Sequence, residues 1–137
     1  MTSVRKPAVA GLFYPAEPAA LHAQIASFLA HAPAAATVPK AIIAPHAGYV
    51  YSGAIAASAY ARLKPARGTI RRVVLLGPSH RVTFHGLAAP SVDAIETPLG
   101  LVSVDRAALQ PLADLPQFVI SDPAHAREHS LEVHLPF

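Results

Sequence analysis

The sequence predicts an α/β fold with an open, partly parallel sheet flanked by helices. Two short apolar runs, residues 40–44 and 71–76, have the length of buried strands, and an alanine-rich stretch lies between them. A strand–helix–strand unit joins parallel strands by a crossover, so both strands end at the same edge of the sheet. The composition is that of a globular chain, since 53% of the 137 residues are hydrophobic and 14% are charged.

The N-terminal part contains an extended arm and one helix. Residues 1–17 are interrupted by prolines and a glycine, and Phe13 and Tyr14 are expected to anchor this arm on the body of the protein. Residues 18–31 predict a helix, because a proline stands in the first turn and apolar residues recur at helical spacing. A linker rich in proline and alanine follows at 32–39.

The middle of the chain continues with the first predicted strand, a helix and the second strand. Ser52 is expected to cap a helix over residues 53–63, whose small side chains permit close packing on a sheet. The second strand leads into a loop at 77–86 that contains two glycines, a proline and two histidines. Residues 87–90 predict a further short strand.

The last part of the chain alternates short strands with turns and one helix. Asp105 is a typical helix N-cap residue. The elements expected here are, in order, a turn at 96–100, a strand at 101–104, a helix over 106–113, a strand at 117–120 and a polar tail at 122–137. The sequence contains no internal repeat and no boundary between two domains.

The charge and the N-terminus exclude several kinds of partner. Five of the 11 Lys and Arg residues lie in residues 62–72, a solvated loop without the aromatic residues of a nucleic-acid motif, so we expect no nucleic-acid partner. The chain has no cysteine, which excludes disulfides and Cys-ligated zinc within it. The first residues lack the apolar core of a signal peptide and no apolar run is long enough to span a bilayer, so we expect a cytoplasmic protein without membrane contact.

Two histidines, His46 and His80, each follow one of the apolar runs. If both runs end at one edge of the sheet, the two imidazoles lie close together where open α/β sheets bind ligands. Neutral imidazole is the commonest metal ligand in proteins, and two histidines with one carboxylate bind Fe(II) in non-haem oxygenases. The alternative is that both are ordinary polar loop residues. A phosphate site on the neighbouring glycines is not favoured, because no Walker or dinucleotide motif is present.

A second group of polar residues lies in the tail segment REHSLEVHLPF. If this segment is helical, Glu128 and Glu132 are neighbours on one face, and His125 and His129 are spaced likewise. Such a cluster supplies a metal ligand or a general acid and base near neutral pH. The alternative is the charged face of an ordinary amphipathic helix.

Five stretches of the chain match the motifs of a known family in the same order. They are RKPAVAGLFYP, APHAGYVYSG, LLGPSH, ETPLGLVSVD and EHSLEVHLPF. The chain therefore resembles the Memo family, whose bacterial members are labelled AmmeMemoRadiSam system protein B. This family is similar in fold to the catalytic subunit of class III extradiol ring-cleavage dioxygenases, which use non-haem Fe(II) at the edge of an α/β sheet.

The resemblance implies roles for several residues. His46 of APHAGY and His80 of GPSH correspond to the first two metal-binding positions, and the metal expected is non-haem iron or copper. Glu128 and His129 fall in the family's EHS motif, so we expect them to be catalytic. By similarity to the dioxygenases, His129 faces the same pocket and hydrogen-bonds a substrate or bound oxygen.

Four further residues are expected to line the substrate pocket. Under the resemblance, Tyr49 and Tyr51 line the cleft after His46, with packing as their alternative role. Ser79 and His85 lie in the loop around His80, and His85 is alternatively a surface residue. Ser79 does not indicate an acyl-transfer nucleophile, because no nucleophile-elbow sequence surrounds it.

Memo proteins continue beyond the motif at which this sequence ends. Their second half supplies the remaining metal ligand, a cysteine, and a further pocket histidine. This chain has no cysteine and ends at Phe137, so we expect residues 1–137 to be a truncated, N-terminal part of a single Memo-like α/β domain. Such a part is expected to leave sheet edges and apolar faces uncovered and to retain metal weakly.

Two functions remain open from the sequence. One is a metal-dependent, oxygenase-like oxidoreductase built around the two histidines. The other is a non-catalytic accessory protein that binds a small molecule or peptide and works with a radical-SAM protein and an AMMECR-type protein, as the family label implies. The sequence names no substrate.

Overall fold

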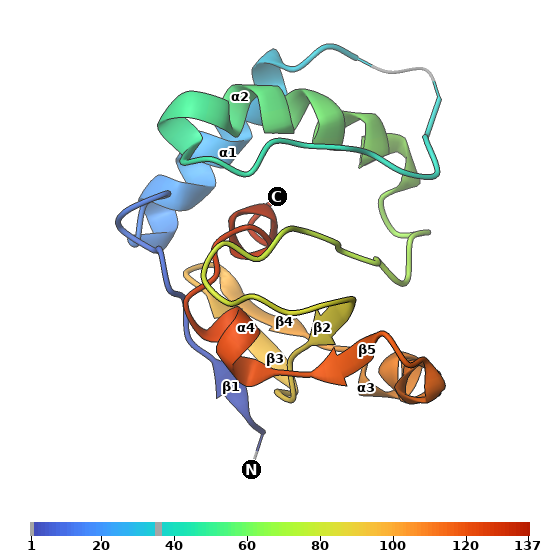
Figure 1. Cartoon of the computed structure of the whole chain (residues 1–137). Helices are drawn as coiled ribbons and strands as arrows, with labels where there is room; N and C mark the ends of the chain where they lie inside the picture. Colours follow the sequence, from blue (N-terminus) through green and yellow to red (C-terminus); the bar gives the residue numbers. More distant parts are fainter. Residues whose placement is uncertain (1, 35–36) are drawn as a thin grey trace.

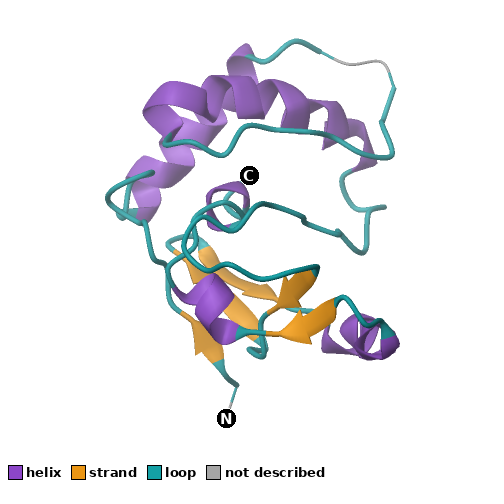
Figure 2. Ribbon diagram, viewed as in Figure 1, coloured by secondary structure: helices purple, strands orange, loops and turns teal. Residues whose placement is uncertain are grey.

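The computed structural model describes residues 2–34 and 37–137, which form a helical layer and a strand layer (Figures 1 and 2). Helices α1 (Pro18–His31) and α2 (Tyr49–Tyr60) pack against each other in the first layer. The short helices α3 (Arg106–Leu109) and α4 (Asp122–Ala126) lie with the strands. The C-terminal residues lie between the two layers (Figure 1).

The strands form two small sheets. The first has the order β1-β3-β4, in which β1 pairs with β3 in parallel and β3 pairs with β4 antiparallel. The second contains β2 and β5, paired in parallel. The strands are β1 (Val4–Arg5), β2 (Leu87–Ala89), β3 (Ala94–Thr97), β4 (Gly100–Ser103) and β5 (Phe118–Ile120). The predicted α/β class with a partly parallel arrangement is therefore confirmed.

The turn predicted at 96–100 joins β3 and β4 in a hairpin. Gly100 has a φ of +129°, a backbone conformation that residues with a side chain rarely adopt. The Thr97 hydroxyl donates to the Gly100 carbonyl at 3.0 Å and accepts from the Leu99 amide at 3.1 Å. These bonds close the turn and fix the register of the hairpin.

The strands predicted at 40–44 and 71–76 are wrong. Both segments are extended, but among the described residues neither pairs with another strand. They are also not buried, since Ile43 is 99% exposed and Val74 is 79% exposed. The apolar composition of a segment indicates that it suits a strand position, but a strand forms only where a neighbouring chain supplies hydrogen-bond partners.

The predicted helices form with some changes of bounds. The helix at 18–31 is confirmed, whereas the helix expected at 53–63 begins at Tyr49 and continues after Tyr60 as a 3₁₀ segment, η1 (Ala61–Ala66). Ser52 lies inside α2 rather than capping it, and its hydroxyl donates to the Ala47 carbonyl at 3.1 Å. Residues 35 and 36 of the predicted linker lie outside the described residues.

The helix expected over 106–113 is divided into α3 and a 3₁₀ segment, η2 (Gln110–Asp114), because a proline stands at the start of η2. The Asp105 cap is confirmed, since its carboxylate accepts from the Ala108 amide at 3.0 Å. The tail is also divided, into α4 and η3 (Glu132–His134). Glu128 and Glu132 therefore do not share one helix.

The core joins the N-terminal arm to the C-terminal tail. Tyr14, as predicted, is buried, and it packs with the α1 residues and Tyr49. The buried Glu132 carboxylate accepts from the Ala8 and Val9 amides and from the Tyr14 hydroxyl at 2.7–3.0 Å. The members of the core cluster are Val9, Tyr14, Leu21, Ile25, Tyr49 and Val133.

Among the described residues, no helix combines the length and the apolarity that crossing a membrane requires.

Candidate metal centre

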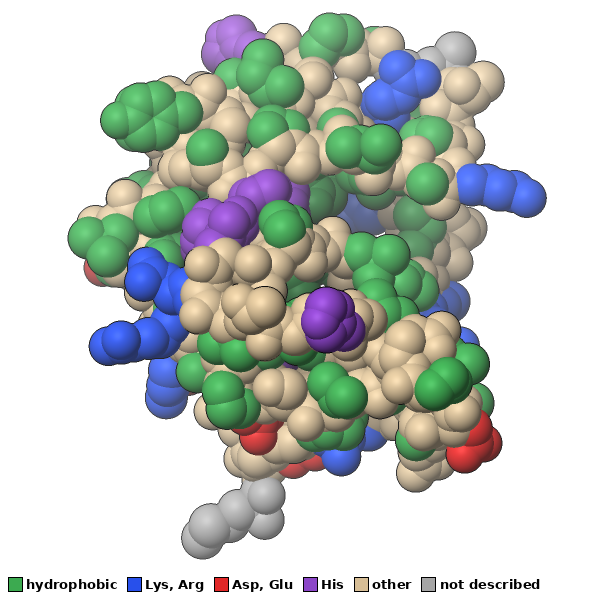
Figure 3. All heavy atoms as spheres, in the orientation of Figure 1, with side chains coloured by type: hydrophobic (Ala, Val, Ile, Leu, Met, Phe, Trp, Pro, Cys, Tyr) green, Lys and Arg blue, Asp and Glu red, His purple; other side chains and the backbone are tan. Residues whose placement is uncertain are grey.

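Three histidine side chains converge at the surface between the two layers (Figure 3). Each of His46, His80 and His129 offers a ring nitrogen, and these nitrogens all lie within 4.8 Å of one another. The ring centroids of His46 and His80 are 5.3 Å apart, and those of His80 and His129 are 4.6 Å apart. The structure thus brings together the two histidines that the sequence placed at one edge, although the segments leading to them are not paired strands.

Close packing of two loops positions His80 against His129. A Cβ added at Gly77 would lie 2.8 Å from the end of the Leu131 side chain and 3.0 Å from the Ser130 hydroxyl, so a larger residue at this position would require these side chains to shift. The Ser130 hydroxyl donates to the Pro78 carbonyl at 2.7 Å and ties the loops together. His80, two residues after Pro78, and His129, directly before Ser130, are therefore neighbours in the site.

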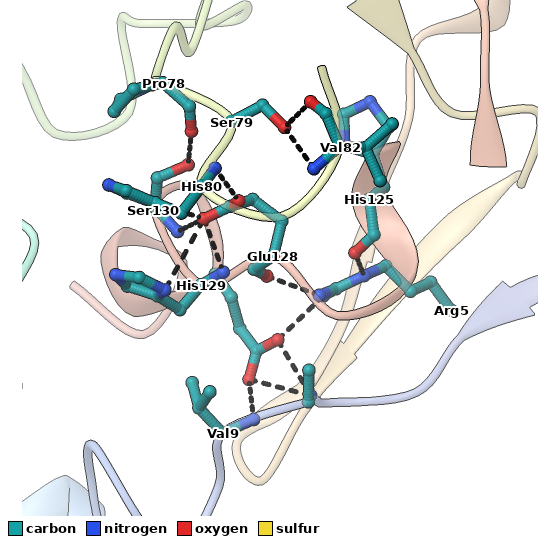
Figure 4. A network of polar contacts seen from close by, with 12 residues as sticks. Arg5, Val9, Pro78, Ser79, His80, Val82, His125, Glu128, His129 and Ser130 are labelled. Carbon is teal, nitrogen blue, oxygen red and sulfur yellow. Dashed lines mark hydrogen bonds and ion pairs between the residues drawn. The ribbon is translucent and has the colours of Figure 1, made fainter. Parts of the chain in front are cut away.

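The Glu128 carboxylate contacts the rings of both His80 and His129 (Figure 4), with Oε1 2.8 Å from Nδ1 of His80 and 3.5 Å from Nδ1 of His129. Its carboxylate accepts from the His80 amide at 2.6 Å and from Nδ1 of the His80 ring at 2.8 Å. It also accepts from the amides of His129 and Ser130 at 2.9 and 3.0 Å. A carboxylate on Nδ1 places the proton there and leaves Nε2 as the nitrogen with a free lone pair.

The same bonds determine the charge of Glu128. Burial raises the pKa of this carboxyl, but the hydrogen bonds from His80, Ser130 and His129 outweigh burial and lower the pKa to about 2. Glu128 is therefore an anion at neutral pH, and its acceptor capacity is used within the protein. This geometry gives Glu128 a contact that orients His80, and the catalytic role expected of Glu128 from the sequence stays a prediction.

Arg5 in turn positions the backbone at Glu128. Its guanidinium donates to the carbonyls of His125 and Glu128 at 2.7 Å each (Figure 4). It also forms an ion pair with the Glu132 carboxylate at 2.8 Å, where its side chain is only 9% exposed. Sequence reasoning missed this residue, because nothing local to the N-terminal arm indicates a contact with the tail.

Of the two histidines that contact Glu128, His129 is less exposed than His80. Its side chain is 18% exposed, whereas that of His80 is 40% exposed. Burial lowers the pKa of His129, the Glu128 anion partly opposes this, and His80 and His46 lower it further. The ring is consequently neutral at about pH 7 and carries a free lone pair.

Comparison with known proteins identifies the family of this chain. The family described as Memo-like protein matches residues 5–137. The chain belongs to this family. A MEMO1 family protein of Aquifex aeolicus is 41% identical over 134 residues, which cover 98% of this chain and 49% of that protein. Protein MEMO1 of Xenopus laevis is 40% identical over 134 residues, which cover 97% of this chain and 44% of that protein.

This Memo-like chain spans about half the length of the curated relatives it matches. A third relative, a MEMO1 family protein of Methanothermobacter thermautotrophicus, is 38% identical over 143 residues, 51% of its length. The three histidines and Glu128 all lie inside the matched residues.

The remaining predicted pocket residues of the Memo-like chain lie outside the histidine cluster. Tyr49 is buried in the core, and its hydroxyl donates to the Val133 carbonyl at 2.7 Å, which fits its alternative packing role. Tyr51 is 85% exposed on α2. The Ser79 hydroxyl donates to the Val82 carbonyl at 2.7 Å and closes a turn, and His85 is an exposed loop residue.

Two hollows adjoin the site. One, of about 150 Å³, lies behind Glu128 and is lined by Gly77, Ser79 and His125 among others. The other is an open depression of about 480 Å³ beside His80, between Arg81 and Arg127. A ligand bound at the histidines therefore has open space on the His80 side. His125 does not join the site, because its Nε2 contacts the Ala88 carbonyl at 3.0 Å.

Proposed function

We propose that this Memo-like chain carries a redox-metal site, for non-haem iron or copper, in an oxygenase-like pocket. The observation behind the proposal is the convergence of His46, His80 and His129, with ring nitrogens within 4.8 Å of one another. Imidazole is a suitable ligand for both metals. The resemblance to class III extradiol dioxygenases, which bind iron at the edge of an α/β sheet, supports the same assignment.

The nitrogen donors fit such an ion. We assign His46 and His80 as its protein ligands, and Glu128 keeps His80 in the tautomer that offers Nε2. Two imidazole ligands leave positions open for a substrate, which has access through the depression beside His80. A bound iron or copper ion would supply Lewis acidity and redox chemistry at this point.

His129 is assigned as the acid–base group of the pocket. Its ring stacks on that of His80 with an interplanar angle of 12°, and Phe13 packs against it at a centroid distance of 4.6 Å. Because burial keeps this imidazole neutral near pH 7, its nitrogen can accept a proton from a ligand beside it. The packing restricts the ring to one orientation, which general-base function requires.

Metal binding tests the two ligands. The chain is titrated anaerobically with Fe(II), and separately with Cu(II), and bound metal is measured before and after a chelator. We expect weak binding that the chelator reverses, and no binding after His46→Ala combined with His80→Ala. The matched control is His22→Ala with His31→Ala, two exposed histidines of α1. Equal metal content in the first double variant would overturn the assignment.

A single variant distinguishes an acid–base role of His129 from a role as a metal ligand. His129→Ala is expected to keep the metal but to abolish the pH dependence of the absorbance change when catechol is added. Loss of metal as complete as in the double variant would make His129 a ligand instead. Oxygen uptake by the metal-loaded protein with catechols supports the oxygenase assignment, whereas absence of uptake favours the non-catalytic accessory function.

A further inference from the structure

Two arginines lie beside the histidine cluster, each next to one partner of the Glu128–His80 contact. Arg81 directly follows His80, and Arg127 directly precedes Glu128. The Glu128 carboxylate accepts from the His80 amide and ring at 2.6 and 2.8 Å, so this contact holds the two backbone segments together. Both arginines line the open depression of about 480 Å³ beside His80. Figure 3 shows Lys and Arg side chains next to the histidines on this face of the molecule.

Local hydrogen bonds fix the backbone at both arginines. Arg81 lies in a closed turn, in which the Ser79 hydroxyl donates to the Val82 carbonyl at 2.7 Å and accepts from the Val82 amide at 3.4 Å. Arg127 ends α4, and its amide donates to the His125 carbonyl. Both arginine side chains are exposed, so their guanidinium groups are accessible to a ligand in the depression.

The depression carries positive charge that no neighbouring carboxylate neutralises. Among the described residues, neither Arg81 nor Arg127 forms an ion pair, whereas Arg5 and Arg72 each pair with a carboxylate. Glu128, the acidic neighbour of Arg127 in the sequence, directs its carboxylate to His80 instead. None of the residues that line the depression is acidic; they are His80, Arg81, Val82, Pro123, Ala126 and Arg127.

We propose that Arg81 and Arg127 bind the oxyanion of a small ligand, a carboxylate or a phosphate group, whose other end lies at the histidine cluster. A guanidinium group binds such oxyanions through two parallel N–H donors. Val82, Pro123 and Ala126 provide apolar contacts for the body of the ligand, and a depression of about 480 Å³ has the volume of a small-molecule site. As an assignment of substrate class this rests on the proposed function, whereas binding of the anion requires no metal.

Ligand binding to the metal-free chain tests the anion site by itself. Benzoate and phenyl phosphate are compared with phenol, which has the same ring without an oxyanion, and dissociation constants are obtained from amide chemical shifts in NMR titrations. We expect the anions to bind about tenfold more tightly than phenol, and high salt to reduce this preference. The shifted amides should be those of residues 80–82 and 126–127. The anion with the lower dissociation constant identifies the preferred group.

Removal of both guanidinium groups tests the two arginines. Arg81→Met combined with Arg127→Met should reduce the ratio of anion to phenol affinity to about one, because methionine keeps an apolar side chain but lacks the charge. The matched control is Arg62→Met with Arg67→Met, which removes the same charge from exposed positions in η1 and at its end. This control should keep the ratio, and thermal unfolding verifies that both variants fold.

A second comparison tests the connection between the anion site and the histidines. The Fe(II)-loaded chain is titrated with catechol and with protocatechuate, which is catechol with a carboxylate on its ring. We expect protocatechuate to bind about tenfold more tightly and the double arginine variant to lose this preference. If Fe(II) does not bind, the proposed function is wrong, and the metal-free titrations still decide whether the anion site exists.

Three results would overturn the proposal. The first is equal affinity of the metal-free chain for phenol and for both anions. The second is a preference for anions that persists without Arg81 and Arg127, or that the control variant loses to the same extent. The third is equal affinity of the Fe(II)-loaded chain for catechol and protocatechuate, which would separate the anion site from the histidine cluster.

Discussion

The carboxylate of Glu128 accepts hydrogen bonds from both the backbone amide and the ring of His80, a residue 48 positions away in the sequence. One side chain therefore fixes the position of a histidine and the tautomer of its imidazole. Metal-binding histidines in proteins are commonly oriented in this way by an outer carboxylate. The relationship makes the stability of the loops and the chemistry of the site depend on one buried anion.

Glu128→Gln should reduce the pH dependence of stability. The pKa of Glu128 is lowered from 4.5 to about 2 in the folded protein, so its contribution is complete above the unfolded value and is lost as the pH falls from 4.5 towards 2. The variant should lose this part of the slope in urea unfolding measured across the acidic range. Asp114→Asn, which removes an exposed carboxylate of η2, is the control.

The pKa of His129 should respond to its neighbours with opposite signs. NMR titration of the ring is expected to give a pKa below 6.5, because burial disfavours the charged form. Glu128→Gln should lower this pKa further, since the Glu128 anion raises it. His46→Ala should raise it, since His46 lowers it. Shifts in the reverse directions would show that a different set of charges surrounds the ring.

Arg5→Met should destabilise the fold by about 3 kcal/mol or more, since it leaves the buried Glu132 carboxylate without its cation and two carbonyls without donors. Lys6→Met provides a control at the next position, where an exposed ion pair with Glu96 contributes about 1 kcal/mol or less. Urea unfolding measures both. Equal losses for the two variants would contradict the role given to Arg5.

Gly77→Ala should move the His80 loop away from Ser130 and Leu131, because the added methyl group overlaps their side chains. Overpacking of this kind costs about 1–3 kcal/mol, and metal affinity should fall with it. Gly48→Ala is a suitable control, since its added Cβ lies at 3.5 Å or more from its neighbours. Chemical denaturation and Fe(II) titration of both variants test the expectation. Unchanged affinity in Gly77→Ala would mean that the loops tolerate separation.

Local signals in the sequence predicted the elements whose stability is local. The α1 helix has the predicted bounds because its apolar spacing and its first-turn proline are properties of the segment itself. The Asp105 cap formed for the same reason. In contrast, the runs at 40–44 and 71–76 form strands only if another segment supplies backbone hydrogen-bond partners, and the composition of a run does not show whether such a segment lies beside it.

The candidate site was predictable only in part. The proximity of His46 and His80 followed from the expected crossover, and the structure brings them together. The contact of Glu128 with His80 and the contact of Arg5 with the tail join residues far apart in the chain, so no local pattern indicates them. Tyr49 lies in the core among residues from both ends of the sequence, so no local pattern indicates its burial.

The Glu132 contacts with the N-terminal arm have a consequence for biosynthesis. Ala8 and the carboxylate that binds its amide are 124 positions apart, so the arm emerges from the ribosome long before its anchor is made. The carbonyl of Glu128, to which Arg5 donates, is likewise synthesised 123 residues after Arg5. The histidine cluster therefore assembles only after residue 129 has been translated, and a nascent chain that stops before residue 132 lacks the carboxylate that binds the N-terminal arm.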